Sequence, residues 1–440
     1  MRFGILTQYY PPEIGAPQAR LSELAACLIR RGHEVTVLTA MPNYPAGRIH
    51  QGYSGLLRRE TMAGARVIRT AIYPTRALGA RRLASYGSFV ASSSALGLFA
   101  LPRLDLLMTE SPPLFLGFAG FFLSRMKQAR WIFNVSDLWP ESAVRLGAVR
   151  DGLALDLAWK LEAFCYRKAW LVSGQSREIL DDVTRRFPRV PVWHLSNGAQ
   201  PELFSPQARS VEARQKLGGG SCIALYAGLH GIAQGLNQIL RAAEMLRDVG
   251  GLRIALIGEG PEKAALVRAA RERGLSNVTF LDPVPRAQMP ELLASADLAL
   301  VPLKEHLPGA VPSKIYEAMA AGVPVVLAAQ GEAADVIRRS SCGVAVAPND
   351  AEALAGAVRE LAANEPQRRA FGEAGLKAAW GEFNRRAILD RFISHLERSL
   401  PHAHLQRSRS APQFHEDGAD RYRNEETAVA SDPGAHGAAL

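Results

Sequence analysis

Short apolar strands alternate with amphipathic helices along most of the chain, and this alternation restricts the folds that it can adopt. The first cycle is a strand at 2–7, a helix at 20–31 and a strand at 33–38. Further strands are predicted at 65–70, 104–108, 130–135, 170–173 and 191–195. Strands that alternate with helices predict a parallel sheet with helices on its faces.

A second alternating series follows the segment 205–221, where polar residues and three consecutive glycines indicate a linker. It predicts strands at 222–227, 253–257, 297–301 and 323–328, and helices at 234–247, 261–273, 313–321 and 350–363. We therefore expect an α/β protein with two doubly wound domains, at 1–200 and 201–375. A helix at 376–400 is expected to cross back to the first domain, and the aperiodic, polar tail at 401–440 is expected to be disordered.

Length and composition fit a globular chain of two domains. The 440 residues are 48% apolar, which is enough to bury a sizeable core. Four cysteines without CxxC spacing favour neither a zinc site nor a disulfide framework, and no apolar run near the N-terminus resembles a signal peptide. We expect a cytoplasmic protein. The uncharged segment 83–101 contains serines and predicts a buried or interfacial helix rather than a membrane span.

The net charge of +10 is concentrated in the first half of the chain. Residues 1–200 carry +11, residues 201–400 carry +1 and the tail carries −2. Between residues 45 and 103, nine arginines, including Arg81 and Arg82, face one acid, Glu60. Next to apolar segments, such a basic region favours an anionic membrane surface, and its alternative is an ordinary solvated face. A nucleic-acid partner is not expected, because no recognisable binding module is present.

Loops that follow strands are the expected ligand sites, since parallel sheets bind ligands at the carboxyl ends of their strands. Gly15 lies after the first strand and allows close approach of a phosphate, unless the loop is simply a tight turn. After the strand at 222–227, the loop residues Gly228, His230, Gly231 and Gln234 could surround a diphosphate. His230 could donate a hydrogen bond to an anion, although a lone loop histidine is often incidental. Gly260 lies in a third strand-to-helix turn.

The segment 311–326 carries the clearest indication of a ligand. Pro312 and Ser313 open a short helix, and Gly322 ends it. Lys314 lies in the first turn, where a cation opposes the helix dipole by ~0.3–1 kcal/mol, a cost that a bound anion would reverse. Glu317 shares a face with Lys314 and could accept the ribose hydroxyls of a nucleotide. The alternative is a surface lysine–glutamate pair.

Several segments resemble the retaining glycosyltransferases of family 4, which have the GT-B fold. They are 8–13, 31–39, 196–198, 258–261 and 312–324. More narrowly, 42–45, 137–142 and 230–235 are similar to WbuB-type enzymes of bacterial O-antigen and capsule assembly, which resemble N-acetyl-fucosamine transferases. The resemblance implies two Rossmann-like domains that face each other across a cleft and a UDP-linked sugar donor held in the second domain.

The resemblance also implies roles for particular residues. Glu317 would contact the ribose, and the loop from Gly228 to Gly231 would lie near the diphosphate. The family often has a second glutamate eight positions before Glu317, where this chain has Gly309. This chain also lacks the Arg and Lys that the family usually has after the loop at Gly228. Lys314 is therefore our candidate to neutralise the diphosphate, without a metal ion or other cofactor.

Asp137 follows the predicted strand at 130–135 and is our candidate to orient or deprotonate the acceptor hydroxyl, or else it caps the next helix. The expected acceptor is a polyprenyl-diphosphate-linked sugar at the inner face of the plasma membrane. Two other functions remain open at this point. One is a GT-B epimerase or hydrolase that turns over the donor without a lipid, and the other is an inactive sugar-binding subunit, which Gly309 would explain.

Overall fold

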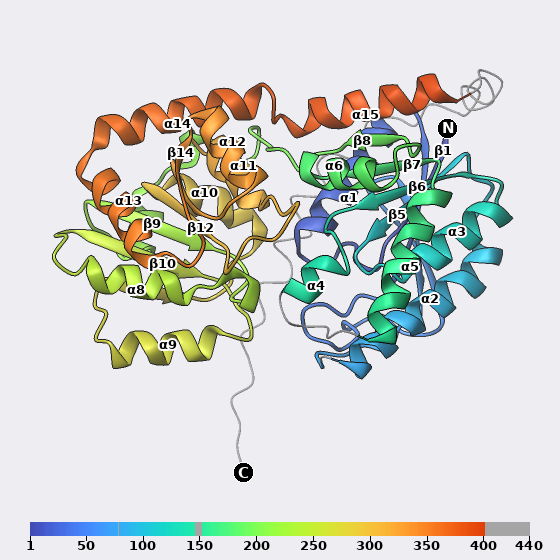
Figure 1. Cartoon of the computed structure of the whole chain (residues 1–440), viewed down its shortest axis with the longest axis horizontal. Coiled ribbons are helices and arrows are strands. Elements are labelled where there is room, and N and C mark those ends of the chain that lie inside the picture. Colours follow the sequence, from blue (N-terminus) through green and yellow to red (C-terminus); the bar gives the residue numbers. More distant parts are fainter. Residues whose placement is uncertain (78, 146–151, 401–440) are drawn as a thin grey trace, which may run out of the picture. The chain divides into compact units, whose positions relative to one another are not determined.

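The computed structural model describes residues 1–77, 79–145 and 152–400, and residues 1–399 form one compact unit (Figure 1). The expected disordered tail lies outside the described residues. Two sheets, parallel except for the edge strand β3, organise the unit. The first has eight strands in the order β3-β4-β2-β1-β5-β6-β7-β8, and the second has six in the order β11-β10-β9-β12-β13-β14. The prediction of a two-domain α/β fold with Rossmann-like sheets is confirmed.

The first sheet and its helices occupy residues 2–194. The strands are β1 (Arg2–Leu6), β2 (Glu34–Ala40), β3 (Leu57–Met62), β4 (Ala65–Thr70), β5 (Leu106–Ser111), β6 (Arg130–Val135), β7 (Leu171–Gly174) and β8 (Val192–His194). The helices are α1 (Ala16–Arg30), α2 (Ala80–Ala100), α3 (Leu116–Met126), α4 (Glu141–Arg145), α5 (Leu153–Lys168) and α6 (Arg177–Arg186). Strand β3 was not predicted. It is a polar edge strand antiparallel to β4, and edge strands lack the continuous apolar run of the buried ones.

The second sheet and its helices begin within the expected linker, which contains the short helices η1 (Pro206–Ala208) and α7 (Val211–Lys216). The strands are β9 (Cys222–Ala227), β10 (Leu252–Ile257), β11 (Val278–Leu281), β12 (Leu298–Pro302), β13 (Val325–Ala328) and β14 (Gly343–Val346). The helices are η2 (Ile232–Gln234), α8 (Asn237–Met245), α9 (Lys263–Glu272), η3 (Arg286–Gln288), α10 (Met289–Ala294), α11 (Ser313–Ala320), α12 (Glu332–Ser340), α13 (Ala351–Ala363) and α14 (Glu365–Trp380).

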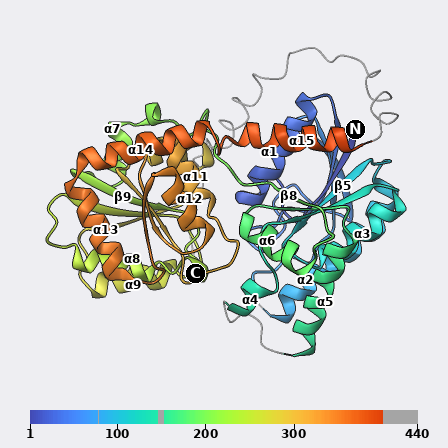
Figure 2. The same cartoon turned by 45° about the horizontal axis from the view of Figure 1, so that its top comes forward.

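The single helix expected at 376–400 is instead two helices, α14 and α15 (Arg385–Ser399), separated at Gly381. Helix α15 contacts α1 of the first domain, as both views show (Figures 1 and 2). At one end, Arg385 donates to Glu23 at 2.9 Å, and at the other, Arg31 pairs with Glu397 at 2.6 Å. The last helix is thus held on the first domain by a buried arginine at one end and by an exposed arginine at the other.

Each sheet has its own core, because its strands are apolar on both faces. On one side of the first sheet, Leu6, Leu38 and Leu107 pack against α2 and α3. In the second domain, the strands pack on one side against α8 and α13, and on the other against α11. These cores fix the strand ends, and therefore fix the loops that follow them.

Candidate functional site

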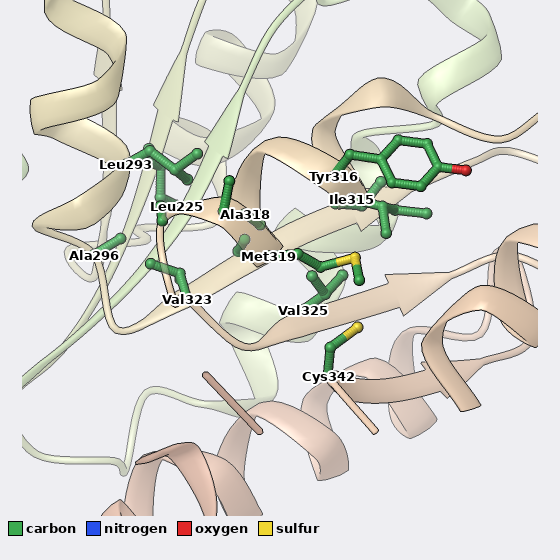
Figure 3. Close-up of a cluster of buried hydrophobic side chains, with 14 of the residues drawn as sticks. Leu225, Leu293, Ala296, Ile315, Tyr316, Ala318, Met319, Val323, Val325 and Cys342 are labelled. Carbon is green, nitrogen blue, oxygen red and sulfur yellow. The ribbon is translucent and has the colours of Figure 1, made fainter. Parts of the chain in front are cut away.

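Helix α11 is anchored in the core of the second domain. Ile315, Met319 and Ala318 are fully buried, and they pack with Leu225 and Val325 of the sheet (Figure 3). Since the apolar residues face the sheet, Lys314 and Glu317 lie on the other side of the helix, where they are half-buried. The anchoring gives this pair a fixed position at the start of the helix.

The N-terminus of α11 has no cap. Pro312 precedes the helix, and no side chain accepts a hydrogen bond from its first turn. Within the described residues, the backbone N–H groups of Ser313 and Lys314 have no hydrogen-bond partner, whereas Ile315 donates to Pro312 at 3.1 Å. Free N–H groups at the positive end of a helix attract an anion.

The ammonium of Lys314 lies over the loop that follows β9. Its Nζ is 5.5 Å from the centre of the Tyr226 ring, and a Cβ added at Gly228 would collide with the lysine side chain. Gly228 also has a positive φ of 149°. A glycine is therefore required here, both by conformation and by the close approach of Lys314. The structure brings the predicted residues Gly228, Ser313 and Lys314 together.

Lys314 forms no hydrogen bond or ion pair with any residue in the described part of the chain, including Glu317 one turn away. Burial lowers the pKa of Lys314, and the charge of Glu317 partly opposes this effect. Burial also raises the pKa of Glu317, against the charge of Lys314. The alternative of a surface lysine–glutamate pair does not fit two half-buried groups that are more than 4 Å apart. Both are open to a ligand.

Gly260 has a structural role that the sequence did not indicate. The loop after β10 packs directly on the loop after β9, and a Cβ on Gly260 would collide with the backbone of His230. His230 donates its backbone N–H to Glu259 at 2.8 Å, and Glu262 donates to the His230 carbonyl at 3.0 Å. The glycine therefore permits contact between two loops.

His230, a predicted diphosphate ligand, is buried beside the loop at Gly228. Its side chain is fully buried, between Tyr226 and Phe280, whose ring centres lie 5.9 and 6.3 Å away. Burial lowers the pKa of the imidazole. Both nitrogens of the ring are buried without a hydrogen-bond partner among the described residues, and the role of His230 stays a prediction.

The predicted helix after this loop begins later than expected. Gln234 ends the short helix η2, Gly235 is left-handed, and α8 begins at Asn237. Gly231 is buried, and its Cα faces the side chain of Gln234, whose Oε1 is buried without a hydrogen-bond partner among the described residues. Gly231 and Gln234 therefore lie beside the loop at Gly228. Gln234 is not at the N-terminus of α8, which begins at Asn237.

In the first domain, Gly15 lies in the loop after β1 and Asp137 in the loop after β6, and β5 separates these two strands in the sheet. Gly15 precedes α1, and Pro17 occupies its first turn. Asp137 follows β6 and is half-buried. Burial raises the pKa of Asp137. The Ser142 hydroxyl donates to the Leu138 carbonyl at 2.7 Å. The roles of Asp137 in the reaction and as a helix cap both stay predictions.

A buried polar network at the same edge of the first sheet was missed by sequence reasoning. The guanidinium of Arg20 pairs with Glu110 and donates to Ser136 at 2.6 Å and to Asn197 at 2.9 Å. Asn197 also donates to Gln175 at 2.9 Å. These residues are far apart in sequence, and they are in contact because the strand order of the sheet places their loops side by side. The network fixes the loop at Ser136, immediately before Asp137.

Gly309, which stands where the family often has a glutamate, contacts helix α6 of the first domain. Gly309 has a φ of 78°, and an added Cβ would collide with Ile179 of α6. Its backbone N–H donates to Glu178 Oε2 at 2.7 Å, and the Glu178 N–H donates to Glu332 Oε2 at 2.8 Å. A carboxylate from the first domain thus lies beside the position where the family often has a glutamate.

The nine arginines do not form a single basic surface, which corrects the expectation from the sequence. Arg69 is fully buried and donates to Glu60 at 2.5 Å. Arg66 pairs with Glu34 at 3.0 Å. Arg81 is exposed, whereas Arg82 is half-buried against Tyr86. Ion pairs with glutamates therefore neutralise part of the positive charge that the sequence suggests for a membrane surface.

No group of three or more His, Cys, Asp or Glu side chains converges as a metal site in the residues that the structure describes. Helix α2 is long and apolar enough, by length and composition alone, to cross a membrane. One of its faces is buried at Phe89, Ser93 and Gly97.

Comparison with known proteins assigns a domain type to each sheet. Residues 15–198 match the glycosyl transferase 4-like domain, and residues 210–378 match the glycosyl transferases group 1 domain. The chain is 29% identical over 368 residues to WcaI of Escherichia coli K12, a relative named for colanic acid biosynthesis, with 80% of this chain and 89% of the relative covered.

Solved structures agree on the fold. The sucrose-phosphate synthase of Thermosynechococcus elongatus superimposes with a TM-score of 0.72 at 20% identity, covering 90% of this chain and 98% of that protein. Anabaena HepE in complex with UDP-glucose gives a TM-score of 0.68 at 18% identity, covering 91% of this chain and 100% of that protein. With a 4-like domain followed by a group 1 domain on two Rossmann-like sheets, this chain belongs to the glycosyltransferases of the GT-B fold.

Proposed function

We propose that the protein transfers a sugar from a nucleoside-diphosphate sugar to a polyprenyl-diphosphate-linked sugar, with retention, in the synthesis of a cell-surface polysaccharide. WcaI is named for colanic acid biosynthesis, and the HepE structure was solved with UDP-glucose, which supports a polysaccharide pathway and a UDP-linked donor. The resemblance of segments 42–45, 137–142 and 230–235 to WbuB-type enzymes favours UDP-N-acetyl-fucosamine as the donor.

The observation that carries this proposal is the unpaired ammonium of Lys314 at the uncapped start of α11. When the bond between the anomeric carbon and the donor phosphate breaks, negative charge develops on the leaving diphosphate. Lys314 and the N–H groups of Ser313 and Lys314 supply positive charge at that place. Preorganised donors of this kind are worth about 2.7–4 kcal/mol each in other enzymes. The proposed scheme uses these groups and no metal ion.

Glu317 and Asp137 have complementary roles in the proposed scheme. Glu317 accepts hydrogen bonds from the ribose hydroxyls of the donor. The acceptor hydroxyl oxygen attacks the anomeric carbon on the face from which the diphosphate leaves, and its proton passes to Asp137. The raised pKa of Asp137, caused by burial, makes its carboxylate a stronger base than an exposed aspartate.

An exposed apolar surface supports the membrane location. Helices α2, α3 and α5 contact one another in series, and together they expose large apolar side chains. We call these residues the apolar face: Leu83, Phe99, Phe118, Phe122, Met126, Leu153 and Leu157. Phe99 and Leu153 are 85% and 83% exposed. An apolar surface of this extent is unusual for a protein in water and indicates an interaction site.

The charges around the apolar face favour an anionic bilayer as its partner. Among the described residues of these three helices, five cationic side chains and one acidic side chain are exposed. The acid is Asp156, and the cations are Arg81, Arg125, Lys160, Arg167 and Lys168. Basic residues near an anionic leaflet contribute about 1 kcal/mol each. We therefore propose that the protein lies on the inner face of the plasma membrane, with the apolar face in the lipid.

Donor turnover with and without lipid tests the proposed function. The protein is incubated with a panel of UDP- and GDP-sugars, with and without a bacterial polyprenyl-diphosphate-sugar fraction, and released nucleoside diphosphate is measured. Lipid-dependent release is expected, together with a labelled lipid product of retained configuration. Turnover that is equal without lipid would instead support the epimerase or hydrolase, and binding without any turnover would support a sugar-binding subunit.

A further inference from the structure

Aromatic side chains gather at the edge of the first sheet where a ligand is expected. The four central strands lie in the order β2-β1-β5-β6, and each is followed by a half-buried aromatic residue, with one more contributed by α2. We call these residues the aromatic cluster: Tyr44, Tyr9, Phe115 and Trp139 after the four strands, and Tyr86 on α2. Since carboxyl ends of parallel strands share one edge, this placement matches that of ligand sites in such sheets.

The rings contact one another across the loops. The Tyr9 and Tyr44 rings lie 5.7 Å apart, edge to face, and the Phe115 and Trp139 rings lie 5.6 Å apart in the same manner. Tyr86 lies 6.5 Å from Phe115. Gln8, almost fully buried, donates its amide to the Tyr9 hydroxyl at 3.2 Å. All five rings are partly exposed, so they present flat apolar surface and hydroxyl groups to a ligand rather than filling the core.

Arg82 links the parts of the aromatic cluster. Its guanidinium carbon is 5.4 Å from the centre of the Tyr86 ring, and its Nε donates to the Tyr86 hydroxyl at 3.0 Å. It also interacts electrostatically with Tyr9 and Tyr44. In the described part of the chain, Arg82 has no carboxylate partner, whereas the buried Arg20 and Arg69 are each paired with a glutamate. A half-buried cation without a counter-charge is costly unless an anion binds it.

We propose that Arg82 and the aromatic cluster bind the diphosphate and the first sugar of the lipid-linked acceptor, an assignment that rests on the proposed function. Arg82 provides paired N–H donors for phosphate oxygens, and the aromatic faces provide apolar surface for a sugar ring. Trp139 is two residues from Asp137, so a sugar held here lies near the proposed base.

The position of Arg82 within α2 agrees with a lipid-linked ligand. Arg82 lies at the start of the helix, and the same helix exposes Leu83 and Phe99 of the apolar face. A polyprenyl diphosphate has the same arrangement, because its charged group lies at one end of an apolar chain. Arg81 is adjacent but exposed, and it has no hydrogen bond or ion pair to any described residue. It is therefore a matched control for general surface charge.

Binding of farnesyl diphosphate, a short prenyl diphosphate, tests the assignment. Affinity is measured by calorimetry in the presence of saturating UDP, so that the site at Lys314 is occupied. We expect Arg82→Ala to weaken binding at least tenfold, Arg82→Lys to be intermediate, and Arg81→Ala to remain within twofold of the unchanged protein. Melting temperatures of the variants establish that they are folded. Equal losses in Arg81→Ala and Arg82→Ala, or no binding by the unchanged protein, would overturn the proposal.

A phospholipid headgroup has related chemistry, and a second arm separates it from the acceptor. Soluble dihexanoyl-phosphatidylglycerol is added as a competitor. We expect it to leave farnesyl diphosphate binding unchanged, and displacement through Arg82 would overturn the assignment to a diphosphate. If turnover depends on lipid but Arg82→Ala leaves the KM for the acceptor unchanged, the site is wrong and the function stands. If farnesyl diphosphate binds through Arg82 without lipid-dependent turnover, the proposed function fails.

Discussion

The two sheets of this glycosyltransferase use positive charge differently. In the second domain, which is nearly neutral, α11 is fixed by a buried apolar side, and one lysine, Lys314, is left without a partner. In the first domain, with its large positive excess, Arg20, Arg66 and Arg69 are consumed by ion pairs. The comparison teaches that the number of cations is a poor guide to a binding site, and that an unpaired, half-buried cation is a better one.

The largest expected effect tests the chemistry at the edge of the first sheet. We expect Asp137→Asn to lower kcat by roughly 10²–10⁴-fold, because the amide keeps the size of the side chain but cannot take a proton. Steady-state rates and melting temperature are measured together. Ser142→Ala is the control, since it removes a neighbouring hydroxyl, which donates to the Leu138 carbonyl at 2.7 Å, and leaves the carboxylate in place. A stable Asp137→Asn protein with unchanged kcat would show that the aspartate serves as a cap alone.

The first domain has the apolar face, and the second domain has no exposed apolar surface of the same extent. Replacing the exposed rings of the apolar face tests whether this difference determines membrane binding. We expect the triple change Phe99→Ser, Phe118→Ser and Phe122→Ser to weaken binding to phosphatidylglycerol vesicles roughly 100-fold, at about 1 kcal/mol for each partly exposed ring that enters lipid. Co-sedimentation measures the effect. Trp380→Ser removes an exposed aromatic residue of α14 and is expected to leave binding unchanged. A triple variant that binds like the control would contradict the assignment of this face.

The pH dependence of donor use distinguishes Lys314 from the arginines of the first domain. Burial lowers the pKa of Lys314, so its charge is lost as pH rises, and it is lost at a lower pH than for an exposed lysine. We expect kcat/KM for the donor to fall on the alkaline side. In Lys314→Arg this fall should disappear, because arginine stays charged. An identical alkaline fall in both proteins would assign it to another group.

The smallest expected effect concerns Gly309, which contacts the first domain. Because its φ is positive and a Cβ would collide with Ile179, we expect Gly309→Ala to destabilise the folded protein by about 1–3 kcal/mol. Chemical denaturation measures the change. Gly356→Ala is the control, since it lies in α13 and nothing is within 4 Å of an added Cβ. Equal stability of Gly309→Ala and the unchanged protein would mean that this loop adjusts freely.

The sequence predicted most of the buried strands and the important helix α11, because these are encoded locally by apolar runs and by the Pro312 to Gly322 pattern. It missed the polar edge strand β3, whose apolar pattern is weak. It also did not indicate that His230 and Arg69, two polar residues, are buried by contacts with distant parts of the chain. The network around Arg20 and the aromatic cluster depend on strand order, which residue spacing alone does not give.

The central claim is that the unpaired Lys314 holds the donor diphosphate, and UDP binding tests it most directly. Calorimetry compares the unchanged protein with Lys314→Met, and with Lys377→Met as an exposed lysine of α14 in the same domain. We predict that Lys314→Met weakens UDP binding at least tenfold, while Lys377→Met has no effect. A folded Lys314→Met protein that binds UDP as tightly as the unchanged protein would contradict the account.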